Sequence, residues 1–237
     1  MWYLTMALVG VTAAAFSTLA GFGGGIIFIG FASLFLDIKT VVPLSAGFFM
    51  ALSAAQMVVF RRHIDWRSVG LYCGGALPGI LLGMWFFYLL PGEAMKRILA
   101  GLVLLYVLML VLRSIPEKCP NSPVTASISA IAGIVDAVTA SGGIIQAPLF
   151  LARGLRKEAF VASFGATSVL LNPLKLFLYH RMGFLEPANI ALLGVLVIAG
   201  FLGVLLGRLG LRKITSESFR RLAIGFLVVV AIRMLFF

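Results

Sequence analysis

The sequence GFGGGII occupies residues 21–27, and a near copy, TASGGII, occupies residues 139–145. At a constant shift of 118 residues, four positions are identical in both copies, namely Gly24/Gly142, Gly25/Gly143, Ile26/Ile144 and Ile27/Ile145. Each copy lies between apolar segments, and glycine weakens a helix interior. The pattern therefore predicts a duplicated chain in which each half carries a broken helix.

The composition is that of an integral membrane protein. Hydrophobic residues make up 62% of the 237 positions, charged residues make up only 11%, and the mean hydropathy is +1.12. Six stretches carry few or no charges, at residues 41–60, 68–92, 98–112, 159–174, 187–207 and 222–232. With their flanks, each reaches the roughly 20 residues that cross a bilayer as a helix. Because the alternation of β-strands is missing, the sequence predicts an all-α membrane protein.

The net charge of +11 comes from basic residues in short loops between the apolar stretches. In a soluble protein such a charge would suggest nucleic-acid binding, but in a membrane protein the positive-inside rule explains it. We therefore expect the lipid bilayer as a partner and no nucleic acid. The two cysteines, Cys73 and Cys119, form no CxxC motif and have no histidine nearby, so no metal or other cofactor is expected.

Further identities extend the repeat through both halves of the chain. The shift of 118 residues also aligns Lys39, Ser45 and Gly47 with Lys157, Ser163 and Gly165. Farther along, a shift of 124 residues aligns Gly79, Gly83 and Arg97 with Gly203, Gly207 and Arg221. The repeats are predicted to be residues 1–115 and 124–237, joined by a polar, proline-rich linker at residues 116–123.

The first apolar segment, residues 3–36, is too long for one straight crossing, since 34 residues of helix span about 50 Å and the hydrocarbon core about 30 Å. Its glycines predict a re-entrant or discontinuous helix. A re-entrant hairpin leaves three full spans in each half, and an odd number inverts the second half relative to the first. A segment that crosses once gives four spans in each half and parallel halves.

The distribution of basic residues among the loops distinguishes inverted from parallel halves. Inverted halves place thirteen basic residues in the cytoplasmic loops, namely Arg61, Arg62, Arg67, Arg113, Lys118, Arg153, Arg156, Lys157, Arg208, Arg212, Lys213, Arg220 and Arg221. The four that remain outside are Lys39, Lys96, Arg97 and Arg181. Parallel halves give eleven inside and six outside at best. The stronger asymmetry favours inverted repeats, each with a glycine-broken helix followed by three transmembrane helices.

The two glycine clusters are the predicted substrate site. A helix interrupted within the bilayer leaves backbone N–H groups unpaired, and these attract anions. Transporters commonly bind their substrates at such breaks. The candidates at the breaks are Gly23, Gly24, Gly25, Thr139, Ser141, Gly142, Gly143 and Gln146. The candidates on the spans that follow are Ser45, Ser53, Gln56, Ser163, Thr167, Ser168 and Asn172. Close helix packing is the alternative role for both clusters, and it is the expected role of Gly79, Gly83, Gly203 and Gly207.

Two charged residues lie at predicted membrane depth. Asp136 comes shortly before the second glycine cluster, where an uncompensated charge is costly. Such residues often bind ions or protons, so Asp136 is the candidate proton-coupling group, with a structural hydrogen bond or a position exposed to water as the alternatives. Lys175 lies late in an apolar span and is a candidate substrate-binding residue, although its side chain could instead extend to the membrane interface.

A GxGGG cluster after a helix of small residues, repeated once in about 240 residues, resembles the sulfite exporter TauE/SafE family, also called toluene sulfonate uptake permeases. The positions that fit the family motif are Gly21, Gly23, Gly24, Gly25, Gly142, Gly143 and Pro148, while Thr139 and Ser141 stand where the family has glycine. The resemblance covers essentially the full chain. It implies a secondary carrier for sulfite, sulfonates such as sulfoacetate, or related organic anions, multi-pass in the bacterial inner membrane.

Two other classes of function remain as alternatives. An anion channel would show unitary currents, whereas a carrier would show saturable counterflow. An intramembrane enzyme is suggested by residues 139–142, TASG, which resemble the GxSG motif of rhomboid proteases. Nucleophilic serine chemistry also needs a base, and both histidines, His63 and His180, lie at span ends. We therefore expect no enzyme. A homodimer is left open as a further partner.

Overall fold

The computed structural model describes residues 2–20, 24–33, 35–112, 120–155, 157–185 and 187–210. No strand occurs among these residues, so the predicted all-α class is confirmed for this part of the chain. The helices are α1 (Trp2–Ala20), α2 (Gly24–Ala32), α3 (Ile38–Phe60), α4 (Trp66–Leu89), α5 (Gly92–Leu112), α6 (Ser122–Thr139), α7 (Gly143–Ala152), α8 (Lys157–Arg181) and α9 (Pro187–Gly210), with a 3-10 turn at Arg61–His63. The apolar stretch at residues 222–232 lies outside the described residues.

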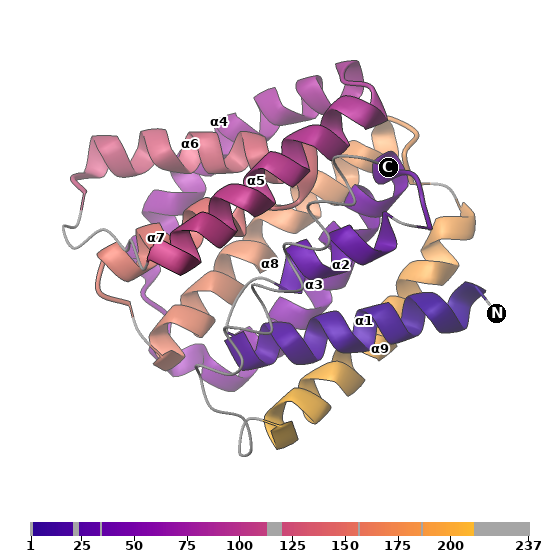
Figure 1. The fold of residues 1–237 in the computed structure, drawn as a ribbon. Helices are drawn as coiled ribbons and strands as arrows, with labels where there is room; N and C mark the ends of the chain where they lie inside the picture. Colours follow the sequence, from indigo (N-terminus) through magenta and orange to yellow (C-terminus); the bar gives the residue numbers. More distant parts are fainter. Residues whose placement is uncertain are drawn as a thin grey trace.

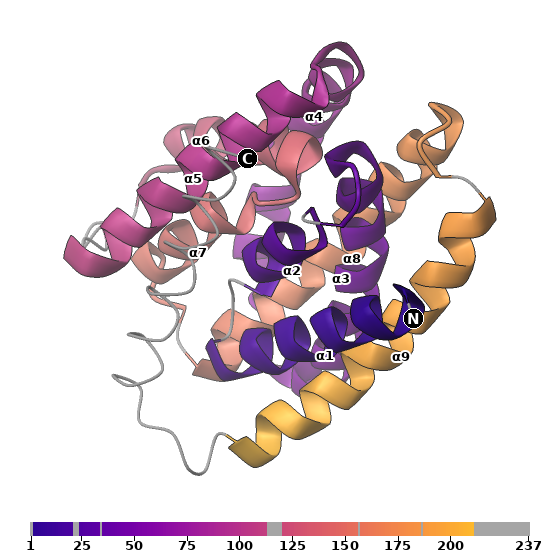
Figure 2. The same ribbon diagram turned by 45° about the vertical axis from the view of Figure 1, so that its right-hand side comes forward.

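Three pairs of packed helices build the molecule (Figures 1 and 2). The pair α3 and α8 lies in the middle, with α1 and α9 on one side and α4 and α6 on the other. The central pair contacts both outer pairs, through α3 against α9 and α4 against α8. The short helix α2 lies against α1 and α3, and the short helix α7 lies against α6 and α8.

The two central helices run in opposite directions. The backbone N–H of Asp65, just beyond the end of α3, donates a hydrogen bond of 2.9 Å to Ser163 Oγ near the start of α8. At the opposite end, Lys39 Nζ near the start of α3 lies 5.5 Å from the ring centroid of Phe184, which follows α8. The start of each central helix therefore lies beside the end of the other.

Polar side chains fix the starts of three helices. The carboxylates of Asp37 and Asp65 accept hydrogen bonds from backbone N–H groups two residues further on, at the starts of α3 and α4. Asn121 accepts from the N–H of Val124 at the start of α6. Each bond satisfies a backbone donor that the helix itself leaves free. The helix α6 thus begins inside the segment predicted as linker, residues 116–123.

Glycines on α4 allow its backbone to approach α6 closely. A Cβ at Gly75 would lie 2.5 Å from the carbonyl oxygen of Ala126, and one at Gly83 would lie 2.7 Å from that of Ile134. Between them, Gly79 faces a backbone carbonyl of α6 in the same way. These glycines recur at four-residue spacing along one face of α4. The predicted packing role of Gly79 and Gly83 agrees with this arrangement.

Substitution of Gly79 by alanine is expected to destabilise the protein by about 2 kcal/mol, because the added methyl group meets fixed backbone rather than a movable side chain. Gly74 on the same helix is the matched control, since a Cβ there would meet no atom within 4 Å. Gly74→Ala should be neutral, or stabilising by up to about 1 kcal/mol through helix propensity. Thermal unfolding in detergent measures both, and equal effects of the two substitutions would contradict this packing.

Four of the described helices contain segments long and apolar enough to cross a membrane, at Ile38–Val58, Trp66–Leu89, Ser122–Thr139 and Glu158–Arg181. Large apolar side chains cover the outer faces of α4 and α9, including Leu81, Trp85, Phe201 and Leu205. Such faces are unfavourable in water but suit contact with lipid chains. The exposed surface of these helices is therefore that of a membrane protein.

Candidate functional site

A cavity of about 100 Å³ lies among the central helices and the junction of α6 and α7. This volume holds several water molecules or a small anion. Its polar lining consists of Ser17, Ser45, Ser53, Gln56, Tyr72, Asp136, Ser141, Gln146, Thr167, Ser168, Asn172 and Lys175. The rest of its lining consists of Gly25, Ala46, Phe49, Leu52, Ala140, Gly143, Ile144, Phe164 and Leu171. Both predicted halves of the chain contribute to it.

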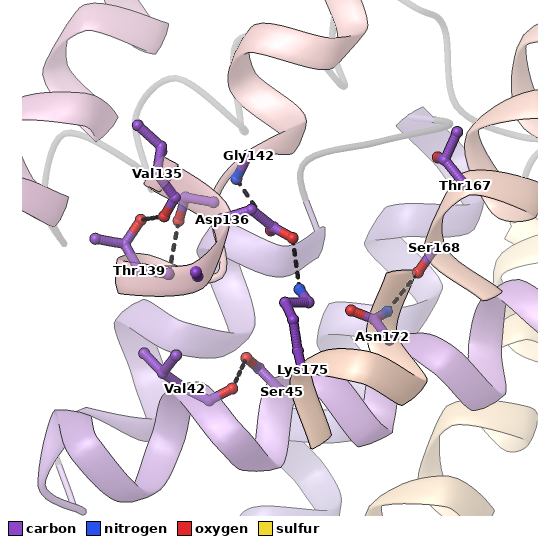
Figure 3. A network of polar contacts seen from close by, with 12 residues as sticks. Val42, Ser45, Val135, Asp136, Thr139, Gly142, Thr167, Ser168, Asn172 and Lys175 are labelled. Carbon is purple, nitrogen blue, oxygen red and sulfur yellow. Dashed lines mark hydrogen bonds and ion pairs between the residues drawn. The ribbon is translucent and has the colours of Figure 1, made fainter. Parts of the chain in front are cut away.

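A buried ion pair lies at the wall of this cavity (Figure 3). Lys175 on α8 is only 2% exposed, and its Nζ lies 2.5 Å from Oδ2 of Asp136 on α6. The Asp136 side chain is itself 23% exposed. Lys175 thus does not extend to the membrane interface, and its charge is held inside the protein. A charge at this depth is costly unless it is paired, and it typically marks a functional site.

The junction between α6 and α7 is built around the same carboxylate. Helix α6 ends at Thr139, and Ala140 adopts a left-handed backbone conformation with φ of 50° while its N–H donates to the carbonyl oxygen of Asp136 at 2.8 Å. The backbone N–H of Gly142 then donates to Asp136 Oδ1 at 3.2 Å, and α7 begins at Gly143. The side chain of Asp136 therefore lies at the N-terminus of α7, where helix N–H groups favour a negative charge.

Side-chain hydrogen bonds order the polar face of α7 and α8. Gln146 Nε2 donates to Thr167 Oγ1 at 2.6 Å, and the Thr167 hydroxyl donates to the carbonyl oxygen of Phe164 at 2.7 Å. One helical turn further along α8, Asn172 Nδ2 donates to Ser168 Oγ at 2.7 Å (Figure 3). These groups supply neutral donors and acceptors beside the charged pair.

The first half of the chain meets this face from the other side of the cavity. Ser45, Ser53 and Gln56 reach it from α3, and the Ser45 hydroxyl donates to the carbonyl oxygen of Val42 at 2.6 Å. Gly25 reaches it from the start of α2, and a Cβ built on Gly25 would lie 3.6 Å from the carbonyl oxygen of Ala140. The last glycine of the first cluster, Gly25, thus lies against the junction of α6 and α7.

Some predicted site residues lie elsewhere. Gly23 is outside the described residues, and Gly24 is the first residue of α2. The Thr139 hydroxyl donates to the carbonyl oxygen of Val135 within its own helix. Gly142 contributes its backbone N–H to Asp136 and is not itself part of the lining. Ser163 accepts from the N–H of Asp65 and so joins the end of α3 to the start of α8.

Two polar lining residues, Ser17 on α1 and Tyr72 on α4, were not predicted. Ser17 is 7% exposed and Tyr72 is 3% exposed. Their signal in the sequence is a hydroxyl within an otherwise apolar stretch, shortly before the first glycine cluster for Ser17. Neither carries a charge or belongs to a spaced motif, so the sequence did not separate them from ordinary lipid-facing or packing positions.

The arrangement around Ser141 does not resemble a serine hydrolase. Its hydroxyl donates to the carbonyl oxygen of Thr139 at 3.1 Å. Both histidines, His63 and His180, are exposed, one in the turn after α3 and the other in the last turn of α8. Within the described residues, no cluster of three His, Cys, Asp or Glu side chains is suited to hold a metal ion. The described lining of the cavity is rich in hydroxyl and amide groups, which can donate and accept hydrogen bonds.

Comparison with known proteins gives one result. A family model described as sulfite exporter TauE/SafE matches residues 6–234, nearly the whole chain. No curated protein and no solved structure gives a match. The family consists of membrane transporters of the sulfite and anion exporter type, whose partners are a small anionic substrate and the lipid bilayer. With its apolar helices and its polar cavity, the chain belongs to the sulfite exporter TauE/SafE family.

Proposed function

We propose that this protein is a secondary transporter that moves a small oxyanion across the bacterial inner membrane by alternating access. The substrate class comprises sulfite, organosulfonates such as sulfoacetate, and related organic anions. The substrate binds in the cavity between α3, α8 and the junction of α6 and α7, within hydrogen-bonding reach of its hydroxyl and amide groups. The proposal extends the family's general function to a particular site and mechanism in this chain.

The observation that carries the proposal is the buried cation of Lys175 at a cavity rich in neutral donors. A lysine buried at membrane depth is costly, so its presence calls for a function. It supplies the positive charge that attracts an oxyanion, while Gln146 and Asn172 can orient the anion through hydrogen bonds. Recognition by one charge and several neutral groups binds an anion firmly enough for selection and weakly enough for release.

Helix packing supports inverted repeats at residues 1–115 and 124–237, joined by the linker at 116–123. Under the repeat alignment, α1 corresponds to α6 and α4 corresponds to α9, so the pair α1 and α9 has α6 and α4 as its counterpart. The glycines at these contacts correspond in the same way. A Cβ at Gly203 on α9 would meet the Val11 carbonyl oxygen on α1, and a Cβ at Gly79 on α4 would meet a carbonyl oxygen on α6. In the antiparallel central pair, α3 corresponds to α8, so the repeat relates this pair to itself. Rocking of one repeat against the other around this pair would open the cavity to alternate sides.

Cysteine accessibility tests the inverted arrangement. Single cysteines at Glu93, Arg181, Arg67 and Glu158, all exposed positions, are introduced after removal of the native cysteines. In intact cells, a membrane-impermeant reagent should label the cysteines at Glu93 and Arg181 from outside and leave those at Arg67 and Glu158 unlabelled. Parallel halves instead put Glu93 and Glu158 on one side and Arg67 and Arg181 on the other. Labelling in that second pattern would refute inverted repeats.

A thermal-shift screen tests the function itself. The purified protein is heated with sulfite, sulfoacetate, thiosulfate or small carboxylates, with chloride as the control for ionic strength. An anion that binds the folded state should raise the melting temperature in proportion to the logarithm of its concentration over its dissociation constant. A concentration-dependent rise for at least one oxyanion is expected. Identical melting curves with all of them and with chloride would argue against a substrate site of this class.

A further inference from the structure

The two groups of the cavity best suited to bind an anion are both held by one carboxylate. Asp136 Oδ2 accepts from the Lys175 ammonium at 2.5 Å, and Oδ1 accepts from the Gly142 N–H at 3.2 Å (Figure 3). Within the described residues, Lys175 has no other ion-pair or hydrogen-bond partner. A buried lysine and the N-terminus of a helix are both natural contacts for an oxyanion. Asp136 thus binds the Lys175 ammonium and the Gly142 N–H as an oxyanion of the substrate would.

Charge balance makes simultaneous occupation by Asp136 and substrate unfavourable. Asp136 and Lys175 together are neutral when both are ionised. An added anion would give two negative groups for one positive group in a largely buried site, where like charges repel strongly. If Asp136 takes up a proton from solution as a singly charged anion arrives, the anion replaces the carboxylate on Lys175 and the site is again neutral. The protonated carboxyl also becomes a hydrogen-bond donor.

We infer that Asp136 is a tethered competitor of the substrate, and that its protonation releases Lys175 and the Gly142 N–H to the incoming anion. This inference rests on the proposed function and specifies how proton and substrate are coupled in it. Proton and anion then bind together, and the empty site returns to the neutral pair of Asp136 and Lys175. Affinity for an anion of constant charge therefore rises as the pH falls, by at most about tenfold per pH unit for one proton.

Other ionisable groups near Asp136 are few. From α4, Tyr72 lies close enough to interact with its charge, and from α8 Tyr179 does so together with Lys175. The Tyr179 hydroxyl is engaged with the carbonyl oxygen of Ala137 at 2.6 Å. Helix α7 has no titratable side chain. On α5, Glu93 pairs with Lys96 at 3.4 Å. Among the described lining residues, only Tyr72, Asp136 and Lys175 are ionisable, so a proton taken up with the anion is assigned to Asp136.

The first test measures binding of methanesulfonate and sulfoacetate between about pH 5.5 and 8.5, where the charge of both probes is constant. Wild-type protein should bind more tightly as the pH falls. Asp136→Asn removes the competing charge. At the upper pH this variant should therefore bind both probes at least about ten times more tightly than wild type, and its affinity should depend little on pH. Asp136→Glu keeps a titrating carboxyl group and should keep the pH dependence. Glu93→Gln, which breaks the exposed pair on α5, is the matched control and should match wild type.

A second measurement needs no variant and remains valid if Asp136→Asn fails to fold. Addition of methanesulfonate to wild-type protein in weak buffer at the upper pH should remove about one proton from solution for each anion bound. Binding without proton uptake would overturn the inference, as would equal affinity and equal pH dependence of Asp136→Asn and wild type. A different result would contradict the proposed function itself: neither these probes nor the anions of the thermal-shift screen would bind wild-type protein at any pH.

Discussion

Substitution of Lys175 by methionine is expected to weaken specific anion binding by at least about 100-fold. Methionine preserves much of the length and apolar stem of lysine but removes the one buried cation of the described cavity lining. Loss of a charge-assisted contact in a desolvated site costs about 3 kcal/mol or more, which corresponds to this factor. Titration of purified protein with sulfoacetate, followed by calorimetry or thermal shift, measures the effect.

The substitution also leaves Asp136 without its partner, so a loss of folding must be separated from a loss of binding. The double variant Lys175→Met with Asp136→Asn removes both charges and should restore folding without restoring binding. Lys96→Met, which removes a partly buried lysine of α5 outside the cavity lining, controls for the change in net charge and should bind like wild type. If Lys175→Met folds and binds sulfoacetate with unchanged affinity, Lys175 does not contact the substrate.

Substitution of Gly143 by valine is expected to abolish binding for a steric reason. A Cβ at this position would lie 3.0 Å from Cζ of Phe164, and both residues line the cavity. The methyl groups of valine would force the Phe164 ring to move and would occupy space that the anion needs, within a cavity of only about 100 Å³. Gly143→Ala should cause a much smaller loss, because its one methyl group meets only the end of a movable ring.

A second-site change distinguishes lost space from a general fault in folding. Phe164→Ala in the Gly143→Val background removes the clashing ring and should recover much of the binding, a coupling of the kind that neighbouring residues show. Gly194→Val on α9, where a Cβ would meet no atom within 4 Å, is the control and should leave binding unchanged. Normal sulfoacetate affinity in folded Gly143→Val would place the substrate away from this junction.

The part of the site that depends on local periodicity could be predicted from the sequence. The spacing of Ser163, Thr167 and Ser168 predicts that a helix brings them roughly to one side; Thr167 and Ser168 line the cavity, whereas Ser163 accepts a hydrogen bond from the Asp65 N–H. Ser53 and Gln56, which the repeat places on the corresponding span of the first half, also line the cavity, as does Asn172 on α8. In these cases the spacing within one helix decides which side chains share a face, so no knowledge of the neighbouring helices was needed.

Contacts between distant helices could not be predicted in this way. The sequence predicts that Asp136 and Lys175 are charged residues at membrane depth, but their direct pairing joins positions 39 residues apart on different helices. The repeat makes Ser163 a candidate site residue, yet its hydrogen-bond partner is the backbone N–H of Asp65, 98 residues away. The spacing of residues along one helix shows which face of that helix each residue lies on. It does not show how that helix is aligned against its neighbours. Tyr72 was missed for the same reason, because only packing brings α4 to the cavity.

Counterflow in proteoliposomes tests most directly whether this cavity is the substrate site of a carrier. Vesicles loaded with unlabelled sulfoacetate are diluted into medium with a trace of labelled sulfoacetate, and uptake is compared for wild type and the double variant Lys175→Met with Asp136→Asn. The account predicts transient, saturable accumulation of label by the wild type and none by the correctly folded double variant. Equal accumulation by both proteins would contradict a substrate site at Lys175, and continuous conductance without counterflow would indicate a channel.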